Sequence, residues 1–360
     1  MGKATAAVFM GPEKPFEVRE FPVVAASAGK VRLSLLASGV CGTDVHIHKG
    51  RLYSPAGRII GHEFVGTVEE IAEEDSRKSG LKPGDRAIVD IACPCGKCKL
   101  CRTGDDANCV HMGVTNGGDP ALPPYLHGGY ARKTFAPPEN LIKIPEGLDP
   151  VAVCVYACVG STVMHAISLA KQAGWAPAPG DTAVVQGLGP MGTFSVALLS
   201  AMGLRVIAVN ACRDQKREDA AQKLGASRVL SLADDAVKEQ IDQLTDGLGA
   251  DICLEASGAP AAFPMGLDLL RNRGMYIVPG QYSVSGGVPV SPEIITFKAL
   301  RIIGSSQYSV CDVRTYLEFL ESHPDLCRIF RSFAATYPVE EVNRAIADAE
   351  AGKNIKTVLI

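Results

Sequence analysis

The sequence lacks the features that direct a chain to polyanions or to the secretory route. Its 36 Lys and Arg residues are outnumbered by 39 Asp and Glu residues, and no window holds five like charges in a row. It therefore has no basic arm of the kind that binds nucleic acid. Near the start, Pro12, Glu13 and Pro15 stand where a secretory signal needs an unbroken apolar stretch. We expect a cytoplasmic protein without a nucleic-acid partner.

The twelve cysteines are expected to be reduced, because disulfides are disfavoured in the cytosol. One apolar run, residues 151–170, contains no Asp, Glu, Lys or Arg and is long enough to cross a bilayer. It includes Ser161, Thr162 and His165, and no basic flank precedes it. These features favour a buried helix between two domains over a transmembrane span. No membrane partner is expected.

A chain of 360 residues with 47 % hydrophobic and 21 % charged residues is typical of a soluble enzyme with about two domains. Up to about residue 150, the apolar runs are short and β-branched, as in Val31–Leu36 and Arg86–Ile91. They predict a mostly antiparallel sheet with long loops. A Pro-rich segment, Trp175–Gly180, has the composition of a link between the two halves.

After Asp181, strand-like and helix-like runs alternate. The strand-like runs are Thr182–Gln186, Arg205–Val209, Asp251–Leu254, Met275–Val278 and Arg301–Gly304. The helix-like runs between them are Phe194–Met202, Asp214–Leu224, Ala236–Leu244 and Ala261–Leu270. This alternation predicts βαβ units and a doubly wound parallel sheet.

Four cysteines are closely spaced in the pattern C-x2-C-x2-C-x7-C, at Cys95, Cys98, Cys101 and Cys109. Four thiolates at this spacing can bind one tetrahedral zinc ion in a closed structural site. The neighbouring Lys97, Lys99 and Arg102 favour the thiolate form. An iron–sulfur cluster also accepts four cysteines, so the spacing alone leaves both open. Cys93 lies outside the pattern.

A glycine-rich segment follows the first strand of the alternating half. It consists of Gly187, Leu188, Gly189, Pro190, Met191 and Gly192. Glycines at these positions allow a tight turn, let backbone amides approach a pyrophosphate, and let helix and strand pack closely. Between a predicted strand and a predicted helix, the segment indicates a dinucleotide-binding loop.

The choice between NAD and NADP stays open. The acidic residue that commonly binds the adenosine ribose is replaced by Asn210, eighteen residues after Gly192. An amide can bind a ribose hydroxyl and does not repel a 2′-phosphate. Arg213, with Lys216 and Arg217, follows closely and can bind phosphate or begin a solvated helix.

Two further segments carry metal-binding residue types, Cys41-Gly-Thr43-Asp44-Val-His46 and Gly61-His62-Glu63-Phe-Val-Gly66. With Ala72, the dinucleotide loop and the four cysteines, the sequence resembles the zinc-containing alcohol dehydrogenases of the medium-chain dehydrogenase/reductase family over nearly its whole length. The resemblance implies an α/β fold with two domains. A GroES-like, mostly-β catalytic domain would comprise residues 1–158 and 300–360, with a structural zinc lobe at 93–111. A Rossmann domain would comprise residues 159–299.

The resemblance also implies a catalytic zinc ion, bound by Cys41, His62 and Cys158, with Glu63 as an adjacent or exchanging ligand. Cys154 lies one helical turn before Cys158 and competes with it. Asp44 would hold the ring of His62.

Thr43 and His46 would form a proton relay. Lys356 stands where relatives often carry an arginine that reaches the cofactor. Compared with arginine, lysine keeps the positive charge but cannot make two parallel hydrogen bonds to one phosphate group. The chain would form a homodimer or a homotetramer.

We therefore expect a cytoplasmic alcohol dehydrogenase with two zinc ions per chain that transfers hydride between a primary or secondary alcohol and NAD or NADP. Three protein ligands leave a position for the substrate oxygen, and zinc lowers the pKa of a bound hydroxyl. One alternative is a zinc-independent double-bond or quinone reductase of the same fold. The other is a zinc-ribbon interaction module. The loop at 113–129, with Tyr53, Tyr282 and Phe297, favours a bulky or partly apolar alcohol over a small polyol.

Overall fold

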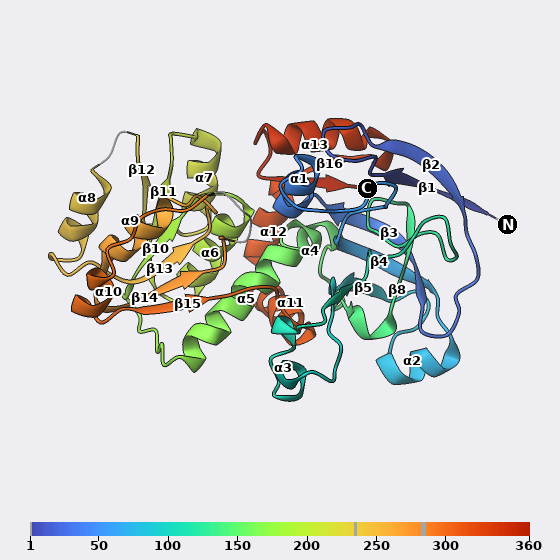
Figure 1. The fold of residues 1–360 in the computed structure, drawn as a ribbon, viewed down its shortest axis with the longest axis horizontal. Helices are drawn as coiled ribbons and strands as arrows, with labels where there is room; N and C mark the ends of the chain where they lie inside the picture. Colours follow the sequence, from blue (N-terminus) through green and yellow to red (C-terminus); the bar gives the residue numbers. More distant parts are fainter. Residues whose placement is uncertain (1, 234–235, 282–285) are drawn as a thin grey trace. The chain divides into compact units, whose positions relative to one another are not determined.

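The structure is a computed structural model that describes residues 2–233, 236–281 and 286–360 (Figure 1). The chain divides into two compact units. The first unit comprises Met1–Ser161 and Gln307–Ile360, and the second comprises Thr162–Ser306. The first boundary falls inside the helix α5 (Ala157–Gln172). Trp175–Gly180 lies inside the second unit, so the prediction that this segment links the two halves was wrong.

The first unit is built on a seven-stranded sheet. The order is β16-β17-β3-β4-β5-β9, and β8 also pairs with β3. Every pair except β16–β17 is antiparallel, which confirms the predicted mostly antiparallel sheet. Its strands are β3 (Val31–Gly39), β4 (Glu63–Glu70), β5 (Arg86–Val89), β8 (Lys133–Ala136), β9 (Leu141–Lys143), β16 (Ala334–Tyr337) and β17 (Lys356–Leu359).

Two small sheets complete the β-structure of this unit, β1 (Lys3–Val8) with β2 (Glu17–Pro22), and β6 (Ala92–Cys93) with β7 (Gly113–Val114). The core of the main sheet forms because alternate positions of each strand point to the same face. Val31 and Leu33 of β3 pack there with Phe64 and Val68 of β4.

The helices of the first unit connect these strands. They are α1 (Gly42–His48), α2 (Glu73–Ser79), α3 (Lys99–Arg102), α4 (Pro150–Val155), α11 (Val310–Ser322), α12 (Pro324–Phe333) and α13 (Val342–Glu350), with short 3₁₀ turns at Asp106–Asn108, Pro138–Asn140 and Val339–Glu341. The apolar run 151–170 forms two helices, α4 and α5, with Tyr156 between them. No helix among the described residues is long and apolar enough to cross a membrane.

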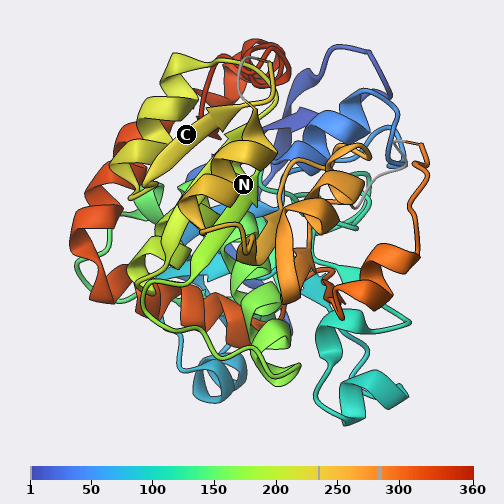
Figure 2. The ribbon, with the colours of Figure 1, turned by 90° about the vertical axis from the view of Figure 1, so that its left-hand side faces the viewer.

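The second unit is a parallel six-stranded sheet in the order β12-β11-β10-β13-β14-β15, as predicted for a doubly wound fold. Its strands are β10 (Thr182–Gln186), β11 (Arg205–Asn210), β12 (Arg228–Ser231), β13 (Ala250–Glu255), β14 (Leu270–Val278) and β15 (Arg301–Gly304). Besides α5, its helices are α6 (Pro190–Ala201), α7 (Gln215–Lys223), α8 (Val237–Leu244), α9 (Ala262–Leu269) and α10 (Glu293–Phe297). Figure 2 faces this unit and shows helices on both sides of the sheet.

The strand order reverses between β10 and β13. From β10 the chain proceeds outward through β11 and β12, and then returns to β13 beside β10 before proceeding the other way. In open parallel sheets, ligands bind at the carboxyl ends of the strands where the order reverses. The dinucleotide loop follows β10 directly and therefore lies at this place.

Candidate metal and dinucleotide sites

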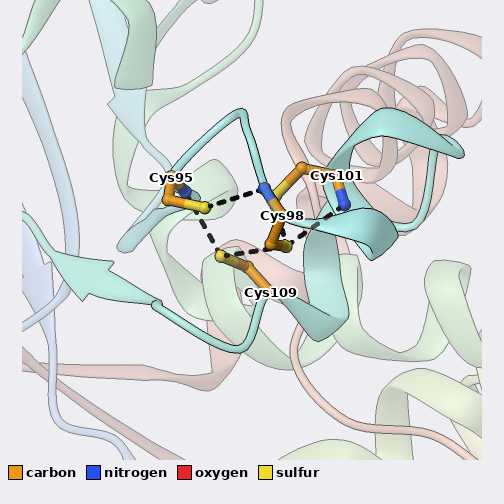
Figure 3. A group of neighbouring side chains, drawn as sticks. All are labelled: Cys95, Cys98, Cys101 and Cys109. Atoms are coloured by element: carbon orange, nitrogen blue, oxygen red, sulfur yellow. Dashed lines mark hydrogen bonds between the residues drawn. The ribbon is translucent and has the colours of Figure 1, made fainter.

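The four spaced cysteines come together in the first unit (Figure 3). One ligand atom from each of the four lies within 4.8 Å of the others. Backbone amides donate to the sulfurs: the amide of Cys98 lies 3.4 Å from Sγ of Cys95, and that of Cys95 lies 3.2 Å from Sγ of Cys109. Hydrogen bonds from the amides of Cys101 and Val110 lower the pKa of Cys98 to about 6.

This arrangement fits a closed tetrahedral zinc site, because sulfurs converge and the backbone stabilises the thiolate form. Cys93 lies outside the group. Its Sγ lies 3.4 Å from Oδ1 of Asn140, and burial raises its pKa to about 11.

A second group consists of Cys41, His62, Glu63 and Cys158, again with ligand atoms within 4.8 Å of one another. Its members come from distant parts of the sequence but from one unit. Cys41 is the N-cap of α1, directly after β3, and Cys158 belongs to the first turn of α5. His62 and Glu63 stand at the start of β4, where Glu63 pairs with Gly39 of β3. Antiparallel pairing of β3 and β4 thus brings the two segments together.

Asp44 orients this group. One of its carboxylate oxygens accepts a hydrogen bond from the amide of Cys41 at 2.9 Å. The other lies 3.5 Å from Nδ1 of His62. A carboxylate beside Nδ1 leaves Nε2 as the nitrogen that can bind a metal. Asp44 is fully buried, and its Oδ1 makes no hydrogen bond among the described residues.

Cys158, not Cys154, belongs to the group. The thiol of Cys154 donates to the backbone carbonyl of Glu63 at 3.2 Å. Burial raises the pKa of Cys154 well above its ordinary value. The thiol of Cys154 is thus used as a hydrogen-bond donor, and Cys154 is not among the four residues whose ligand atoms converge.

Glu63 forms a buried ion pair with Lys356 of β17. Oε2 of Glu63 binds Nζ of Lys356, and both side chains are almost fully buried. Burial alone would lower the pKa of Lys356, but the Glu63 carboxylate outweighs it and raises that pKa. Gly39 makes room for the pair, since a Cβ there would lie 2.2 Å from Oε2 of Glu63 and 2.9 Å from Cε of Lys356.

The position of Lys356 corrects the sequence prediction. The resemblance makes Lys356 a candidate for binding the cofactor, but its ammonium group is buried against Glu63. The local sequence offered one signal, a single charged residue that opens the apolar strand Lys356–Leu359. Its partner Glu63 lies 293 positions away in sequence.

Thr43 and His46 both lie on α1. Oγ1 of Thr43 lies 3.6 Å from Sγ of Cys41, so the hydroxyl is beside the ligand group. Burial and the nearby charge of Arg51 lower the pKa of His46. The imidazole is therefore neutral at pH 7, the form that can accept a proton.

The dinucleotide loop has the tight backbone expected of it. Gly187 has a φ of +91°, a conformation that favours glycine. A Cβ on Gly192 would lie 1.8 Å from the carbonyl oxygen of Gly187, so only glycine lets α6 approach the loop. Gly189 is the N-cap of α6, and its lack of a side chain leaves the helix N-terminus accessible to an anion. Pro190 and Met191 form the first turn of α6.

The predicted adenosine end lies beyond β11. Asn210 ends this strand, and its Nδ2 donates to the carbonyl of Cys212 at 3.0 Å. Nη1 of Arg213 lies 3.7 Å from Oε2 of Glu218. Arg217 donates to the carbonyl of Leu188 at 2.9 Å and thereby ties α7 to the dinucleotide loop, a contact that the sequence did not predict.

The structure gives less support to the prediction that Tyr53, Tyr282, Phe297 and the loop at 113–129 line a substrate pocket. Tyr53 is 91 % exposed and Phe297 is 81 % exposed. Tyr282 lies outside the described residues. The long loop at 113–129 is tied to its own unit, because Arg58 donates to the carbonyl of Gly118 at 3.2 Å.

Comparison with known proteins agrees with this architecture. Residues 27–146 match the family described as "Alcohol dehydrogenase GroES-like domain", and residues 190–322 match "Zinc-binding dehydrogenase". A sorbitol dehydrogenase of Halalkalibacterium halodurans is 30 % identical over 96 % of this chain and 95 % of its own length. An L-threonine 3-dehydrogenase of Pyrococcus horikoshii is 32 % identical over 80 % of this chain and 78 % of its own. An alcohol dehydrogenase structure from Thermotoga maritima has a TM-score of 0.89 at 27 % identity and covers 100 % of this chain and 99 % of its own.

A parallel sheet with a dinucleotide loop, joined to an antiparallel unit with two groups of metal-ligating residues, defines a nucleotide-dependent metalloenzyme. The chain belongs to the zinc-containing alcohol dehydrogenases of the medium-chain dehydrogenase/reductase family. It is an oxidoreductase that acts on CH–OH groups with zinc and a nicotinamide dinucleotide. The predicted fold class and the predicted type of reaction are thereby confirmed.

Proposed function

We propose that this enzyme oxidises a secondary alcohol at a zinc ion bound by Cys41, His62 and Cys158, while Cys95, Cys98, Cys101 and Cys109 hold a second, structural zinc ion. The ion pair between Glu63 and Lys356 carries this assignment. A carboxylate that is neutralised by a buried lysine leaves three ligands for the metal. Three protein ligands with one open position are the mark of a catalytic zinc site.

The bound zinc ion supplies Lewis acidity, which lowers the pKa of the substrate hydroxyl. The chain's own residues then move the proton. Thr43 accepts it from the alcohol and passes it towards the neutral imidazole of His46, while Asp44 keeps His62 oriented. A nicotinamide dinucleotide held at the loop of residues 187–192 would accept the hydride from the alcohol carbon. The reaction then balances, because an alcohol and the oxidised dinucleotide would give a carbonyl compound, the reduced dinucleotide and one proton.

The names of the relatives favour a secondary alcohol. L-threonine 3-dehydrogenase and 5-exo-hydroxycamphor dehydrogenase are named for substrates whose reacting hydroxyl sits on a secondary carbon. A panel of matched primary and secondary alcohols, polyols included, tests this on zinc-replete enzyme through nicotinamide absorbance. Oxidation confined to primary alcohols would contradict the substrate class. No oxidation with either dinucleotide would contradict the reaction itself.

In this proposal the loop of residues 187–192 binds the pyrophosphate, and Asn210 and Arg213 bind the adenosine end. Asn210→Asp should then shift the preference towards NAD, because a carboxylate repels the 2′-phosphate. Arg213→Ala should weaken NADP selectively. A hydrogen bond to a charged group is worth about 1.5–3 kcal/mol, so a change of about tenfold or more is expected. Equal effects on NAD and NADP would show that neither residue senses the phosphate.

We further propose that the enzyme acts in the cytoplasm as a homodimer or homotetramer. Light scattering coupled to size-exclusion chromatography distinguishes these states by mass. A mass of one chain at micromolar concentration would exclude both.

A further inference from the structure

Glu255 is a buried carboxylate outside the metal groups. It is the last residue of β13 and has no exposed surface. Its Oε1 accepts hydrogen bonds from the amide of Ser257 at 2.7 Å, the amide of Gly258 at 2.9 Å and the hydroxyl of Ser257 at 2.5 Å. Its Oε2 has no partner among the described residues. These three hydrogen bonds to one oxygen hold residues 256–258 against the end of β13. We call residues 256–258 the Ser257 turn.

The Ser257 turn packs directly on the dinucleotide loop. A Cβ on Gly187 would lie 2.8 Å from both Cα and Cβ of Ser257, so the two backbones meet without an intervening side chain. On its other side, Gly258 has a φ of +67°, and a Cβ there would lie 3.0 Å from the carbonyl oxygen of Gly280. The amide of Gly280 in turn donates to the carbonyl of Glu255 at 3.1 Å.

These contacts join the carboxyl ends of β10, β13 and β14. β10 and β13 are the two neighbours between which the strand order reverses. The dinucleotide loop follows β10 and the Ser257 turn follows β13, so the two lie side by side at the edge of the sheet where the strand order reverses. A displacement of the turn removes the support against which Gly187 is packed.

We propose that Glu255 is a positioning residue for the dinucleotide, which fixes the Ser257 turn against Gly187 and thereby sets the shape of the phosphate-binding loop. The inference rests on the proposed role of residues 187–192. Ionised acceptors form stronger hydrogen bonds than neutral ones, which suits one oxygen that has to hold three donors.

Two substitutions separate the acceptor from the rest of the side chain. Glu255→Leu removes the acceptor and leaves buried donors unsatisfied, whereas Glu255→Gln keeps one oxygen. In fluorescence titration of the zinc-replete enzyme, Glu255→Leu should raise the Kd of both NAD and NADP by about tenfold or more, as expected for lost charge-assisted hydrogen bonds. Glu255→Gln should restore the Kd to within about threefold of the parent enzyme. The KM for the alcohol at saturating dinucleotide should stay unchanged in both.

Tyr276→Phe provides the matched control. Its hydroxyl lies 2.8 Å from Oε1 of Gln186 in the buried core of the same sheet. The loss of this hydrogen bond should lower thermal stability but leave the dinucleotide Kd as it was. If Glu255→Leu does not fold, Gly258→Ala tests the same turn, because its Cβ crowds Gly280 and strains a positive φ. Either folded variant should also speed hydrogen exchange in the peptide that contains the turn.

The outcomes distinguish this inference from the proposed function. A parent enzyme that binds neither dinucleotide overturns both. A parent enzyme that binds, with a disturbed turn that binds equally well, overturns only the role of Glu255. If Tyr276→Phe weakens dinucleotide binding as much as Glu255→Leu does, then general destabilisation explains the effect and the positioning role is wrong.

Discussion

The two groups of metal-ligating residues in the first unit differ in how the chain assembles them. The four cysteines lie within one short segment, and three of the four are partly exposed. Cys41, His62, Glu63 and Cys158 come from the N-cap of α1, the start of β4 and the first turn of α5, and they are mostly buried. One group is a property of local spacing. The other group forms only when β3, β4 and α5 have packed together in the folded unit.

The electrostatic surroundings differ in the same way. Backbone amides donate to the sulfur atoms of Cys95, Cys98 and Cys109, and every member of the cysteine group offers the same ligand type, a sulfur. In the buried group, Asp44 holds His62 and Lys356 holds Glu63. A set of four equal ligands suits a closed site that stabilises the fold, whereas an uneven set leaves a position for a substrate.

The sharpest test of this comparison is the loss of one ligand from the buried group. Cys158→Ser should reduce alcohol oxidation by about three orders of magnitude or more, because Lewis-acid stabilisation is worth several kcal/mol and each 1.36 kcal/mol is tenfold. The rate of dinucleotide reduction, measured together with the zinc content of the same sample, tests this prediction. Cys154→Ser, one helical turn earlier, is the control and should keep its metal and most of its rate. Equal loss in the two variants would break the assignment of Cys158.

Loss of a ligand from the cysteine group should act on stability instead. Cys95→Ser should lower the zinc content from two ions to one and reduce the free energy of unfolding by several kcal/mol, because metal binding contributes to folding. It should lower the melting temperature more than Cys158→Ser does. Cys93→Ser, which removes a neighbouring thiol outside the group, should leave the metal content at two. An unchanged zinc content in Cys95→Ser would contradict the structural site.

The buried ion pair should be costly to break from one side. Lys356→Met leaves Glu63 buried without its cation, and removal of one partner of such a pair costs about 3–5 kcal/mol of unfolding free energy. The double variant Glu63→Gln with Lys356→Met removes both charges and should recover most of this loss. Denaturant unfolding of metal-free protein measures both. Lys78→Met, in an exposed pair with Glu74, is the control and should change the free energy of unfolding far less.

The smallest effect is expected at the proton relay. The lowered pKa of His46 means that its imidazole stays neutral and able to accept a proton as the pH falls below 7. His46→Gln should therefore slow oxidation mainly below about pH 7, by roughly tenfold, with full metal content. Added imidazole buffer should restore part of the rate.

His48→Gln, on the same helix but paired with Glu350, should leave the shape of the pH–rate profile unchanged. A profile for His46→Gln that is parallel to that of the parent, without rescue by imidazole, would remove His46 from the relay.

The features that could be predicted from the sequence are those encoded locally. In the alternating half, the bounds predicted for β10 and β15 agree with the observed ones. The prediction works there because buried parallel strands appear in a sequence as short apolar runs between turn residues. The cysteine spacing and the glycine pattern are local for the same reason. Each of them needs only a few consecutive residues in one conformation.

The features that could not be predicted depend on contacts between distant segments. Lys356 is a charged residue in a strand, and nothing near it in sequence shows that Glu63 will neutralise it. The Pro-rich segment 175–180 resembled a link, but the boundary between the units falls within α5, where local helix formation continues across it. The break at Tyr156 was missed because an uncharged run carries no clear stop signal. The packing of the Ser257 turn depends on glycines that follow three different strands, Gly187 after β10, Gly258 after β13 and Gly280 after β14.

The second unit is inserted into the first, and this has a consequence for the order of synthesis. Residues 162–306 are continuous, so they can fold as soon as they emerge, whereas the first unit needs segments from both sides of them. Val358 of β17 pairs with Gly39 of β3, and this pairing carries Lys356 to Glu63. During translation Glu63 therefore has no lysine partner until β17, the final strand, has been synthesised. A chain that ends shortly after residue 306 would therefore contain the whole nucleotide-binding unit but an incomplete first unit, in which Glu63 has no lysine partner.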